Sequence, residues 1–232
     1  MEQENYLQFH RKRFDYLFGL VTELKPAAEC RVLDVGPGPF TERLKTHYRE
    51  VWSLGFEETP IFGKEGEGGD RHIVFDLREA MDHWVELPAC DLIVFAEVIE
   101  HVHAEPSRLL AFLATGLKPD GLLVCQTPNA VALHKRLASL AGRASYNRWG
   151  SGHVTEFTKA ELVGLGERVG LRRVRHEFRN YFGYEGSVGK RAAMRVLDVV
   201  TGPFPSLRRG QTIVYQTRML AHMGGPERRT RP

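Results

Sequence analysis

The chain has 232 residues, which suits one domain that buries roughly 70% of the surface its unfolded form exposes. Hydrophobic residues make up 42% and charged residues 26%, with a net charge of +3, so the composition excludes fibrous and disordered classes. The arginines near residues 172–179 and 208–231 form short runs, which are typical of solvated surface or frayed tails. A nucleic-acid surface would need a basic stripe with interleaved aromatic residues, so we expect no nucleic-acid partner.

The location of the protein is predicted from its cysteines and its hydropathy. The three cysteines are widely spaced and form no CxxC pair, which indicates a reducing compartment. No run approaches ~18 apolar residues, and the polar N-terminus lacks a signal-peptide pattern. We therefore expect a cytoplasmic protein without membrane insertion, either a monomer or a homodimer.

Hydrophobic periodicity predicts secondary structure in chain order, beginning with an amphipathic helix over 6–24. In the first half this helix is followed by a strand, a helix, two strands separated by a glycine-rich loop, and a further strand. Their expected ranges are 31–35, 40–47, 51–56, 63–69 (loop), 73–75 and 91–96. In the second half the elements are expected at 107–117 (helix), 121–126 (strand), 131–140 and 159–169 (helices), 171–178 (strand), 192–200 (helix) and 212–218 (strand). Thr158 and Glu161 are placed to form a capping box at the start of the helix over 159–169.

The alternation of strands and helices predicts a doubly wound α/β fold, a mostly parallel sheet with helices on both faces. No internal repeat or linker divides the chain, so we expect a single domain over residues 1–232. Within it, residues 1–28 would form a helical cap and residues 31–180 the ligand-binding core. Residues 181–232 would add a helix, a strand and a tail.

A glycine-rich loop follows the first strand, which is where such folds bind ligands. Asp34 lies near the end of the strand, and Gly36 and Gly38 follow it directly. Glycine allows backbone to approach a ligand closely, although a tight strand-to-helix turn would use the same residues. A nicotinamide fingerprint would need a third glycine where the chain has Thr41.

Two further acidic residues lie at the ends of the next predicted strands. Glu57 comes 23 positions after Asp34, where a carboxylate can accept hydrogen bonds from both ribose hydroxyls. Asp76 ends the third strand and is placed to reach an adenine amino group. Each carboxylate alone is more often a strand-end cap or a turn residue, but three acids at three successive strand ends favour a nucleotide-like cofactor.

Three segments, in order and spacing, resemble the class I S-adenosylmethionine-dependent methyltransferases. They are residues 32–38 (VLDVGPG), 90–102 (CDLIVFAEVIEHV) and 117–123 (LKPDGLL), and with the segment around His153 they span about residues 31–170. The resemblance implies a seven-stranded sheet whose last strand is antiparallel, with S-adenosylmethionine as cofactor. It also implies that Asp34, Gly36 and Gly38 face the methionine part, Glu57 the ribose and Asp76 the adenine.

The chain departs from that family at Phe40, where a third glycine is common. The phenyl ring would either crowd the methionine pocket or pack in the core. Pro39 stiffens a loop that is usually looser.

A second cluster of polar residues follows the fourth strand. If the chain forms a helical turn from Glu97 onward, Glu97, Glu100 and His101 share one face. His153 is a further candidate far along the sequence. In one interpretation His101 or His153 is a general base that takes a proton from a substrate hydroxyl.

In a second interpretation Glu97, Glu100, His101 and His153 hold a divalent cation, Mg²⁺ or Mn²⁺, that would activate the substrate hydroxyl. The Glu-x-x-Glu-His run resembles metal-assisted small-RNA 2′-O-methyltransferases and ubiquinone-pathway O-methyltransferases. The same run also occurs in relatives that use no metal, where Glu97 contacts the cofactor and Glu100 caps a helix.

The segments after strands four to six are expected to build the substrate pocket, with Asn129, Tyr146 and Trp149 as candidate contacts. Residues 141–152 suit a lid over the ligand. The sequence thus predicts an S-adenosylmethionine-dependent O-methyltransferase that acts on a small hydroxylated acceptor, such as a sugar or a natural-product intermediate. The alternatives are N- or C-methylation, a 2′-hydroxyl at an RNA 3′-end, an inactive cofactor-binding partner subunit, and a nicotinamide-dependent reductase.

Overall fold

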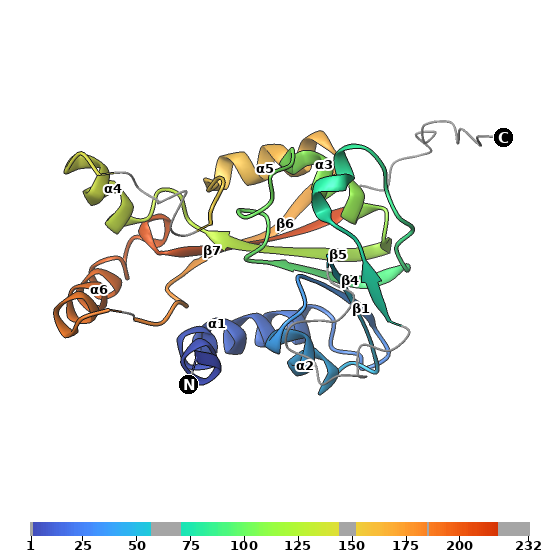
Figure 1. The fold of residues 1–232 in the computed structure, drawn as a ribbon, viewed down its shortest axis with the longest axis horizontal. Coiled ribbons are helices and arrows are strands. Elements are labelled where there is room, and N and C mark those ends of the chain that lie inside the picture. Colours follow the sequence, from blue (N-terminus) through green and yellow to red (C-terminus); the bar gives the residue numbers. More distant parts are fainter. Residues whose placement is uncertain (1, 57–70, 144–151, 185, 218–232) are drawn as a thin grey trace.

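The computed structural model describes residues 2–56, 71–143, 152–184 and 186–217, and its centre is a seven-stranded sheet (Figure 1). The strand order is β3-β2-β1-β4-β5-β7-β6. All neighbouring strands are parallel except at β7, which runs antiparallel to both β5 and β6. The strands are β1 (Arg31–Val35), β2 (Glu50–Gly55), β3 (His72–Val74), β4 (Cys90–Ala96), β5 (Leu117–Pro128), β6 (Leu171–Arg179) and β7 (Gly210–Thr217). The predicted fold class, including the antiparallel last strand, is confirmed.

Helices cover both faces of this sheet (Figure 1). They are α1 (Glu2–Leu24), α2 (Pro39–Lys45), α3 (Pro106–Ala114), α4 (Leu133–Leu140), α5 (Lys159–Arg168) and α6 (Val188–Val200), with short 3₁₀ turns η1 (Leu77–Met81) and η2 (Pro205–Leu207). Helices α1 and α2 lie on one face, and α3 and α5 on the other. Helices α4 and α6 follow the carboxyl ends of β5 and β6 and extend beyond the sheet. Among the described residues, no helix combines the length and apolar content needed to cross a bilayer.

The alternation of side chains along the strands produces two cores, one on each face of the sheet. In β4, Leu92 and Val94 pack against α1 and α2, whereas Ile93 and Phe95 pack against α3 and α5. Successive strand residues point to opposite faces. A central strand of a doubly covered sheet must therefore be apolar throughout, and these four residues are fully buried.

The strand order reverses between β1 and β4, so the loops that follow these two strands lie next to each other. Val35 pairs with Phe95 in the register of the two strands. The residues immediately after each, which include the glycine loop and Glu97, therefore meet at the same edge of the sheet. This is the switch point at which doubly wound sheets bind ligands.

The predicted elements are all present among the described residues, with ends shifted by a few positions. Helix α2 begins at Pro39 because proline, with its fixed φ and missing N–H, suits the first turn of a helix. Strand β5 begins at Leu117, earlier than expected, because Leu117 already pairs with Cys90 of β4. The left-handed Asp120, with a φ of 62°, lies at the register shift that follows this pair. The predicted glycine-rich loop over 63–69 lies outside the described residues.

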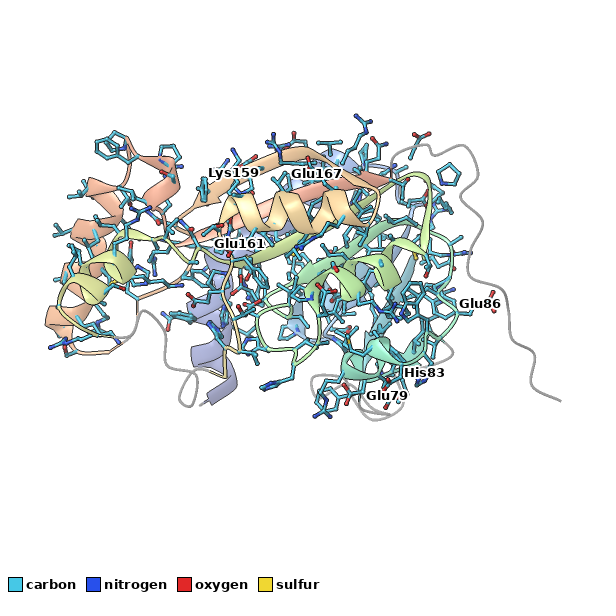
Figure 2. The ribbon with its side chains drawn as sticks, turned by 90° about the horizontal axis from the view of Figure 1, so that it is seen from above. Glu79, His83, Glu86, Lys159, Glu161 and Glu167 are labelled. Carbon is cyan, nitrogen blue, oxygen red and sulfur yellow. The ribbon has the colours of Figure 1, made fainter. Side chains whose placement is uncertain are left out.

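Helix α5 shows the predicted capping box and packs closely on the sheet. Thr158 N–H donates to Glu161 Oε2 at 2.7 Å, and Glu161 N–H donates to Thr158 Oγ1 at 3.2 Å. Figure 2 shows Glu161 with Lys159 and Glu167 along this helix, over the sheet. On its inner side, Tyr215 Oη donates to the carbonyl of Leu162 at 2.6 Å and so anchors the helix to β7.

Two glycines of α5 allow a paired test of this packing. A Cβ added at Gly166 would lie 2.5 Å from Cε1 of Tyr215, whereas one added at Gly164 has no neighbour within 4 Å. We expect Gly166→Ala to lower the free energy of unfolding by about 1–3 kcal/mol through overpacking. Gly164→Ala should raise it by up to about 1 kcal/mol through helix propensity. Urea denaturation of both variants measures the difference, and equal effects would contradict the packing described for α5.

Candidate active site

The glycine loop after β1 is shaped by a close approach of two chain segments. Gly36 has a φ of +82°, and a Cβ at this position would lie 2.7 Å from Cγ2 of Val98. Its N–H donates to the carbonyl of Leu54 at 2.9 Å. Only glycine combines this left-handed conformation with the absence of a side chain. Gly36 therefore holds the loop after β1 directly against the turn after β4.

Asp34 fixes the other side of the same loop from a fully buried position. Thr41 Oγ1 donates to Asp34 Oδ2 at 2.6 Å and accepts from the Gly38 N–H at 2.9 Å. Burial raises the pKa of Asp34 to about 7, against the opposing hydrogen bond from Thr41. Thr41, at the position where a nicotinamide fingerprint needs glycine, thus connects Asp34 to the loop backbone.

Phe40 packs in the hydrophobic core. Its ring stacks on Phe14 of α1 with the ring centroids 5.7 Å apart, and its side chain is almost fully buried. Phe40, which stands where the family often has a third glycine, therefore packs α2 against α1.

The turn after β4 begins with Glu97 in a left-handed conformation, with φ at 57°. This conformation interrupts the helical turn considered from the sequence, and only a short turn follows, in which His101 N–H donates to the carbonyl of Val98 at 2.9 Å. Glu97 Oε2 lies 3.6 Å from a guanidinium nitrogen of Arg13 on α1, and both side chains are buried or nearly so. Burial raises the pKa of Glu97, and the Arg13 charge opposes that rise.

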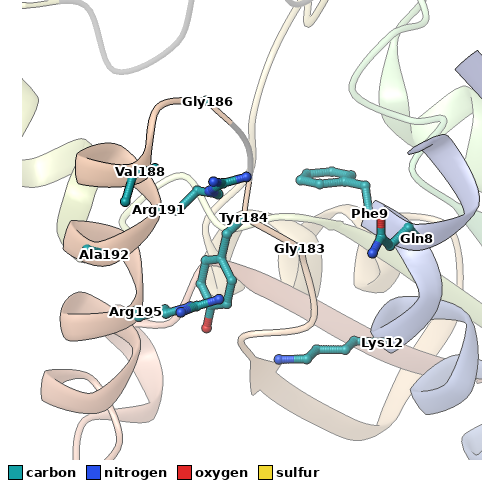
Figure 3. A pocket seen from close by; sticks show the side chains of 10 residues that line it. All are labelled: Gln8, Phe9, Lys12, Gly183, Tyr184, Gly186, Val188, Arg191, Ala192 and Arg195. Carbon is teal, nitrogen blue, oxygen red and sulfur yellow. The ribbon is translucent and has the colours of Figure 1, made fainter.

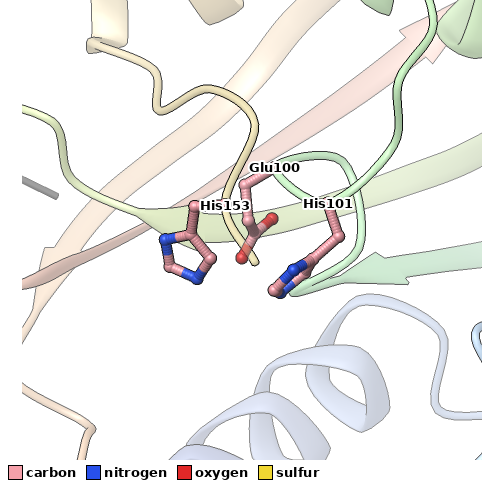
Figure 4. Close-up of side chains that lie close together, drawn as sticks. All are labelled: Glu100, His101 and His153. Atoms are coloured by element: carbon pink, nitrogen blue, oxygen red, sulfur yellow. The ribbon is translucent and has the colours of Figure 1, made fainter. Parts of the chain in front are cut away.

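Glu100, His101 and His153 come together at this edge, as the sequence predicted. One ligand atom of each lies within 4.8 Å of those of the other two, and Figure 4 shows the three side chains gathered together. Glu100 is fully buried, and its Oε2 accepts from Thr127 Oγ1 at 3.1 Å. Its Oε1 is buried and has no hydrogen-bond partner among the described residues. Glu97 does not belong to this group of three.

Burial affects Glu100 strongly and His101, whose side chain is partly open to solvent, less completely. Burial, followed by the nearby Glu97 carboxylate, raises the pKa of Glu100 well above its ordinary value. His101 donates its Nδ1–H to the carbonyl of Gly152 at 3.2 Å, because a carbonyl oxygen can only accept. Burial of part of its ring and the neighbouring His153 lower the pKa of His101. The two imidazole rings meet edge to face with centroids 4.7 Å apart.

His153 is oriented by an ion-paired carboxylate behind it. Its Nδ1 lies 3.0 Å from Glu156 Oε1, and Lys135 Nζ lies 2.5 Å from Glu156 Oε2. Burial alone would raise the pKa of Glu156, but the hydrogen bond from His153 and the Lys135 ammonium hold it below its usual value. The carboxylate is therefore ionised and accepts the Nδ1–H of His153, which leaves the lone pair of the ring on Nε2.

The other predicted contacts lie elsewhere or outside the described residues. Asp76 caps η1, and its carboxylate accepts from the backbone N–H of Arg78 at 2.9 Å and pairs with the Arg78 guanidinium. Asn129 is fully buried, and its amide donates to the carbonyls of Ser206 and Arg208 at 2.9 and 2.8 Å. Glu57, Tyr146 and Trp149 are not among the described residues, nor is most of the predicted lid. Their roles remain predictions.

Sequence reasoning missed three residues that hold site side chains in place: Arg13 contacts Glu97, Thr41 contacts Asp34 and Glu156 contacts His153. Arg13 carried a signal, since it is a cation one turn before Leu17 and two turns before Val21 on the buried stripe of α1. Glu156 carried a weaker signal, namely its position three residues after His153. Nothing local distinguished Thr41, because its partner Asp34 belongs to the preceding strand.

The buried carboxyl group of Asp34 makes a testable contribution to stability. Its folded pKa of about 7 lies above the ordinary 3.8, so between these values the folded protein keeps a proton that the unfolded chain releases. The stability that this proton provides is complete at low pH and is lost as the pH rises through 7. The free energy of unfolding of the wild type should therefore fall relative to that of Asp34→Asn between pH 4 and 7, by on the order of 4 kcal/mol. Urea denaturation across this range measures the difference, and the exposed Asp82→Asn should show little change.

With this geometry established, comparison with known proteins identifies the family. A family model described as a methyltransferase domain matches residues 9–176, which is more than half of the chain. A trans-aconitate 2-methyltransferase from Methylobacterium nodulans is 29% identical over 145 residues, covering 61% of this chain and 55% of that protein. The chain thus matches about half the length of this curated relative.

Solved structures share the fold at low sequence identity. A methyltransferase from Archaeoglobus fulgidus described as SAM-dependent has a TM-score of 0.59 at 19% identity, covering 92% of this chain and 99% of that one. The N-methyltransferase NodS from Bradyrhizobium japonicum, in complex with S-adenosyl-L-homocysteine, has a TM-score of 0.56 at 18% identity, covering 90% and 87%. A Haloferax volcanii complex between the Trm112 methyltransferase activator and a methyltransferase gives 0.66 at 13% identity, covering 96% and 95%. The family match shows that the chain belongs to the methyltransferase-domain family, and the solved structures show that it has the fold of class I S-adenosylmethionine-dependent methyltransferases.

Proposed function

We propose that this protein transfers the methyl group of S-adenosylmethionine to a hydroxyl oxygen of a small acceptor, with His153 as the general base. The observation that carries the proposal is the chain of contacts from Lys135 through Glu156 to His153 at the carboxyl edge of the sheet. A carboxylate held ionised behind an imidazole fixes its tautomer and stabilises the imidazolium that forms on proton transfer. A hydroxyl acceptor needs such a base, because it is a weak nucleophile while it keeps its proton.

The proposed step has a simple balance of atoms and charge. The acceptor oxygen attacks the methyl carbon of the sulfonium as its proton passes to Nε2 of His153. The oxygen–carbon bond forms while the carbon–sulfur bond breaks, and the bonding pair returns to sulfur to give neutral S-adenosylhomocysteine. Because the displacement is in line, much of the rate depends on how the two reactants are positioned. His101, in edge contact with His153, is the alternative base.

We place the cofactor at the switch point, with its methionine part over Asp34, Gly36 and Gly38. The support is the close backbone of this loop and its position opposite Glu97. By the family resemblance, Glu57 would hold the ribose and Asp76 the adenine. For Asp76 this would require the carboxylate to serve both the adenine and the Arg78 guanidinium, which the exposed part of its side chain permits.

The small size of the acceptor is supported by the curated relative, which is named for trans-aconitate. An RNA 3′-end would instead require a basic binding surface and a salt-sensitive association. An acceptor screen with product analysis would reveal N- or C-methylation by the position of the transferred methyl group. It would yield no methylated product if the chain is an inactive partner subunit.

The role of His153 can be separated from cofactor binding. We expect His153→Ala to lower kcat by about 10²–10⁴-fold, the usual contribution of a general base, while the affinity for S-adenosylmethionine changes less than about twofold. Steady-state kinetics and calorimetric titration with the cofactor measure the two quantities. His103→Ala removes an exposed histidine of the same turn region and should leave both unchanged. A large loss of cofactor affinity in His153→Ala would refute the proposed placement.

A divalent cation is a second candidate for the same cluster, and a specific observation favours it. Glu100, His101 and His153 offer ligand atoms within 4.8 Å of one another, and Glu100 Oε1 is buried without a hydrogen bond among the described residues. Both imidazoles contact an oxygen acceptor through Nδ1, the arrangement that orients metal-binding histidines. The residues fit Mn²⁺ or Mg²⁺, which when bound would lower the pKa of an acceptor hydroxyl. Glu97, the fourth ligand predicted from the sequence, is instead paired with Arg13.

Metal removal distinguishes the two candidates. If the cation is required, enzyme stripped with EDTA should lose at least about 90% of its turnover and regain it with Mn²⁺ or Mg²⁺. Calorimetry should then detect Mn²⁺ binding that is lost in Glu100→Gln and kept in His103→Ala. Full turnover after stripping, with no binding of Mn²⁺, would exclude the cation and leave His153 acting alone.

A further inference from the structure

We propose that the pocket between α1 and α6 binds an oxyanion, a carboxylate or a phosphate ester, which the acceptor carries beside a planar or apolar group. This inference rests on the proposed function in one respect, namely that the ligand of the pocket is the methyl acceptor. The pocket has a volume of about 930 Å³, within the range of small-molecule sites. Figure 3 shows it between α1 and α6, lined by Gln8, Phe9, Lys12, Gly183, Tyr184, Gly186, Val188, Arg191, Ala192 and Arg195.

Among the residues that the structure describes, the lining carries three positive charges and no negative charge. Lys12 approaches from α1, while Arg191 and Arg195 approach from successive turns of α6 (Figure 3). In the part of the chain that the structure describes, none of the three lies within ion-pair distance of a carboxylate. Three cations that converge on one cavity repel one another, and a bound anion removes that repulsion.

Asp198, a described acidic residue that contacts Tyr184, is already neutralised. Its Oδ2 lies 2.9 Å from the guanidinium of Arg209, and both side chains are largely buried. It also accepts from Tyr184 Oη at 2.8 Å. Asp198 thus fixes the tyrosine ring in the pocket and leaves the charges of Lys12, Arg191 and Arg195 available for a ligand.

Tyr184 gathers the cations at the pocket. Lys12 Nζ and the guanidinium carbon of Arg195 each lie 5.4 Å from its ring centroid, and that of Arg209 lies 5.2 Å away. Cation–π contacts of this kind hold flexible basic side chains close to the ring. The ring of Tyr184 therefore keeps the charged ends of Lys12 and Arg195 at the rim of the pocket, where both side chains are also exposed to solvent.

The remaining walls suit the uncharged part of an acceptor. Phe9 stacks on Phe182 with centroids 6.4 Å apart, and its carbonyl accepts from the Gly183 N–H at 2.9 Å. A Cβ at Gly183 would lie within 3 Å of Phe9, so the segment after β6 is packed against α1. With Val188 and Ala192 on the opposite side, the pocket offers apolar contact next to its basic residues.

The pocket adjoins the reaction edge through α1. Phe9 is one helical turn before Arg13, which pairs with Glu97 at the end of β4. Four residues of α-helix rise only ~6 Å. In the proposal, an acceptor whose anion lies among Lys12, Arg191 and Arg195 extends its hydroxyl along α1 toward His153 and the cofactor.

The experiment uses the full chain and three probes of one size: phenyl phosphate, benzoate and the neutral benzamide. We expect calorimetry to detect the anions and to show benzamide bound at least about tenfold more weakly. In the Arg191→Gln/Arg195→Gln variant the affinity for the anions should fall at least about tenfold, since two charge-assisted contacts are lost. The matched control, Arg172→Gln/Arg173→Gln, loses the same net charge from exposed residues of β6 and should keep the wild-type affinity. Preference for phenyl phosphate or benzoate identifies the oxyanion.

Equal binding of all three probes, or unchanged anion affinity in Arg191→Gln/Arg195→Gln, would overturn the inference. Arg191 and Arg195 are exposed, so the double variant should keep the wild-type thermal midpoint and cofactor affinity. These two quantities are measured alongside the anion affinities. Failure of the proposed function has a different signature. If the anions bind as expected but no hydroxylated acid or phosphate ester is methylated, the pocket stands and O-methylation is wrong. If only uncharged acceptors are methylated and no anion binds, O-methylation stands and the pocket assignment is wrong.

Discussion

The contact between Gly36 and Val98 is the constraint on which the site depends. The loops after β1 and β4 approach so closely that a single Cβ at Gly36 would collide with the valine side chain. This approach brings the glycine loop, where the family places the cofactor, next to the turn that carries Glu97, Glu100 and His101. A sheet that reverses its strand order between β1 and β4 creates the opening, and Gly36 determines how narrow it is.

Around that opening the protein buries more acidic side chains than basic ones. Asp34, Glu97 and Glu100 are all desolvated, and burial raises the pKa of each. The buried cation that faces them is Arg13 of α1. Unpaired buried charge is costly, so part of this acidity is held in protonated form. The sulfonium cofactor that we propose for this place would bring a positive charge, which the carboxylates would compensate.

The two ends of the site differ in their electrostatics. Near the sheet, carboxylates and imidazoles surround the expected methyl donor. Beyond them, between α1 and α6, Lys12, Arg191 and Arg195 form a basic pocket around Tyr184. An acceptor with an anionic group and a hydroxyl would match both ends, because its charge fits the pocket and its hydroxyl fits the base. Helix α1 connects the two through Phe9 and Arg13.

The sequence by itself determined the fold class, the switch point and the candidate cluster, because each depends on local pattern. Apolar strands such as residues 90–96 and the glycines after β1 are readable without knowledge of distant contacts. One interpretation of the sequence grouped Glu100, His101 and His153 with Glu97 as candidate metal ligands, and the structure brings the first three together. Only the tertiary structure decided that Glu97 turns to Arg13, that Glu156 and Lys135 stand behind His153, and that Phe40 packs on Phe14. These contacts join residues from separate elements, and their geometry is set by how helices pack on the sheet, which sequence periodicity does not specify.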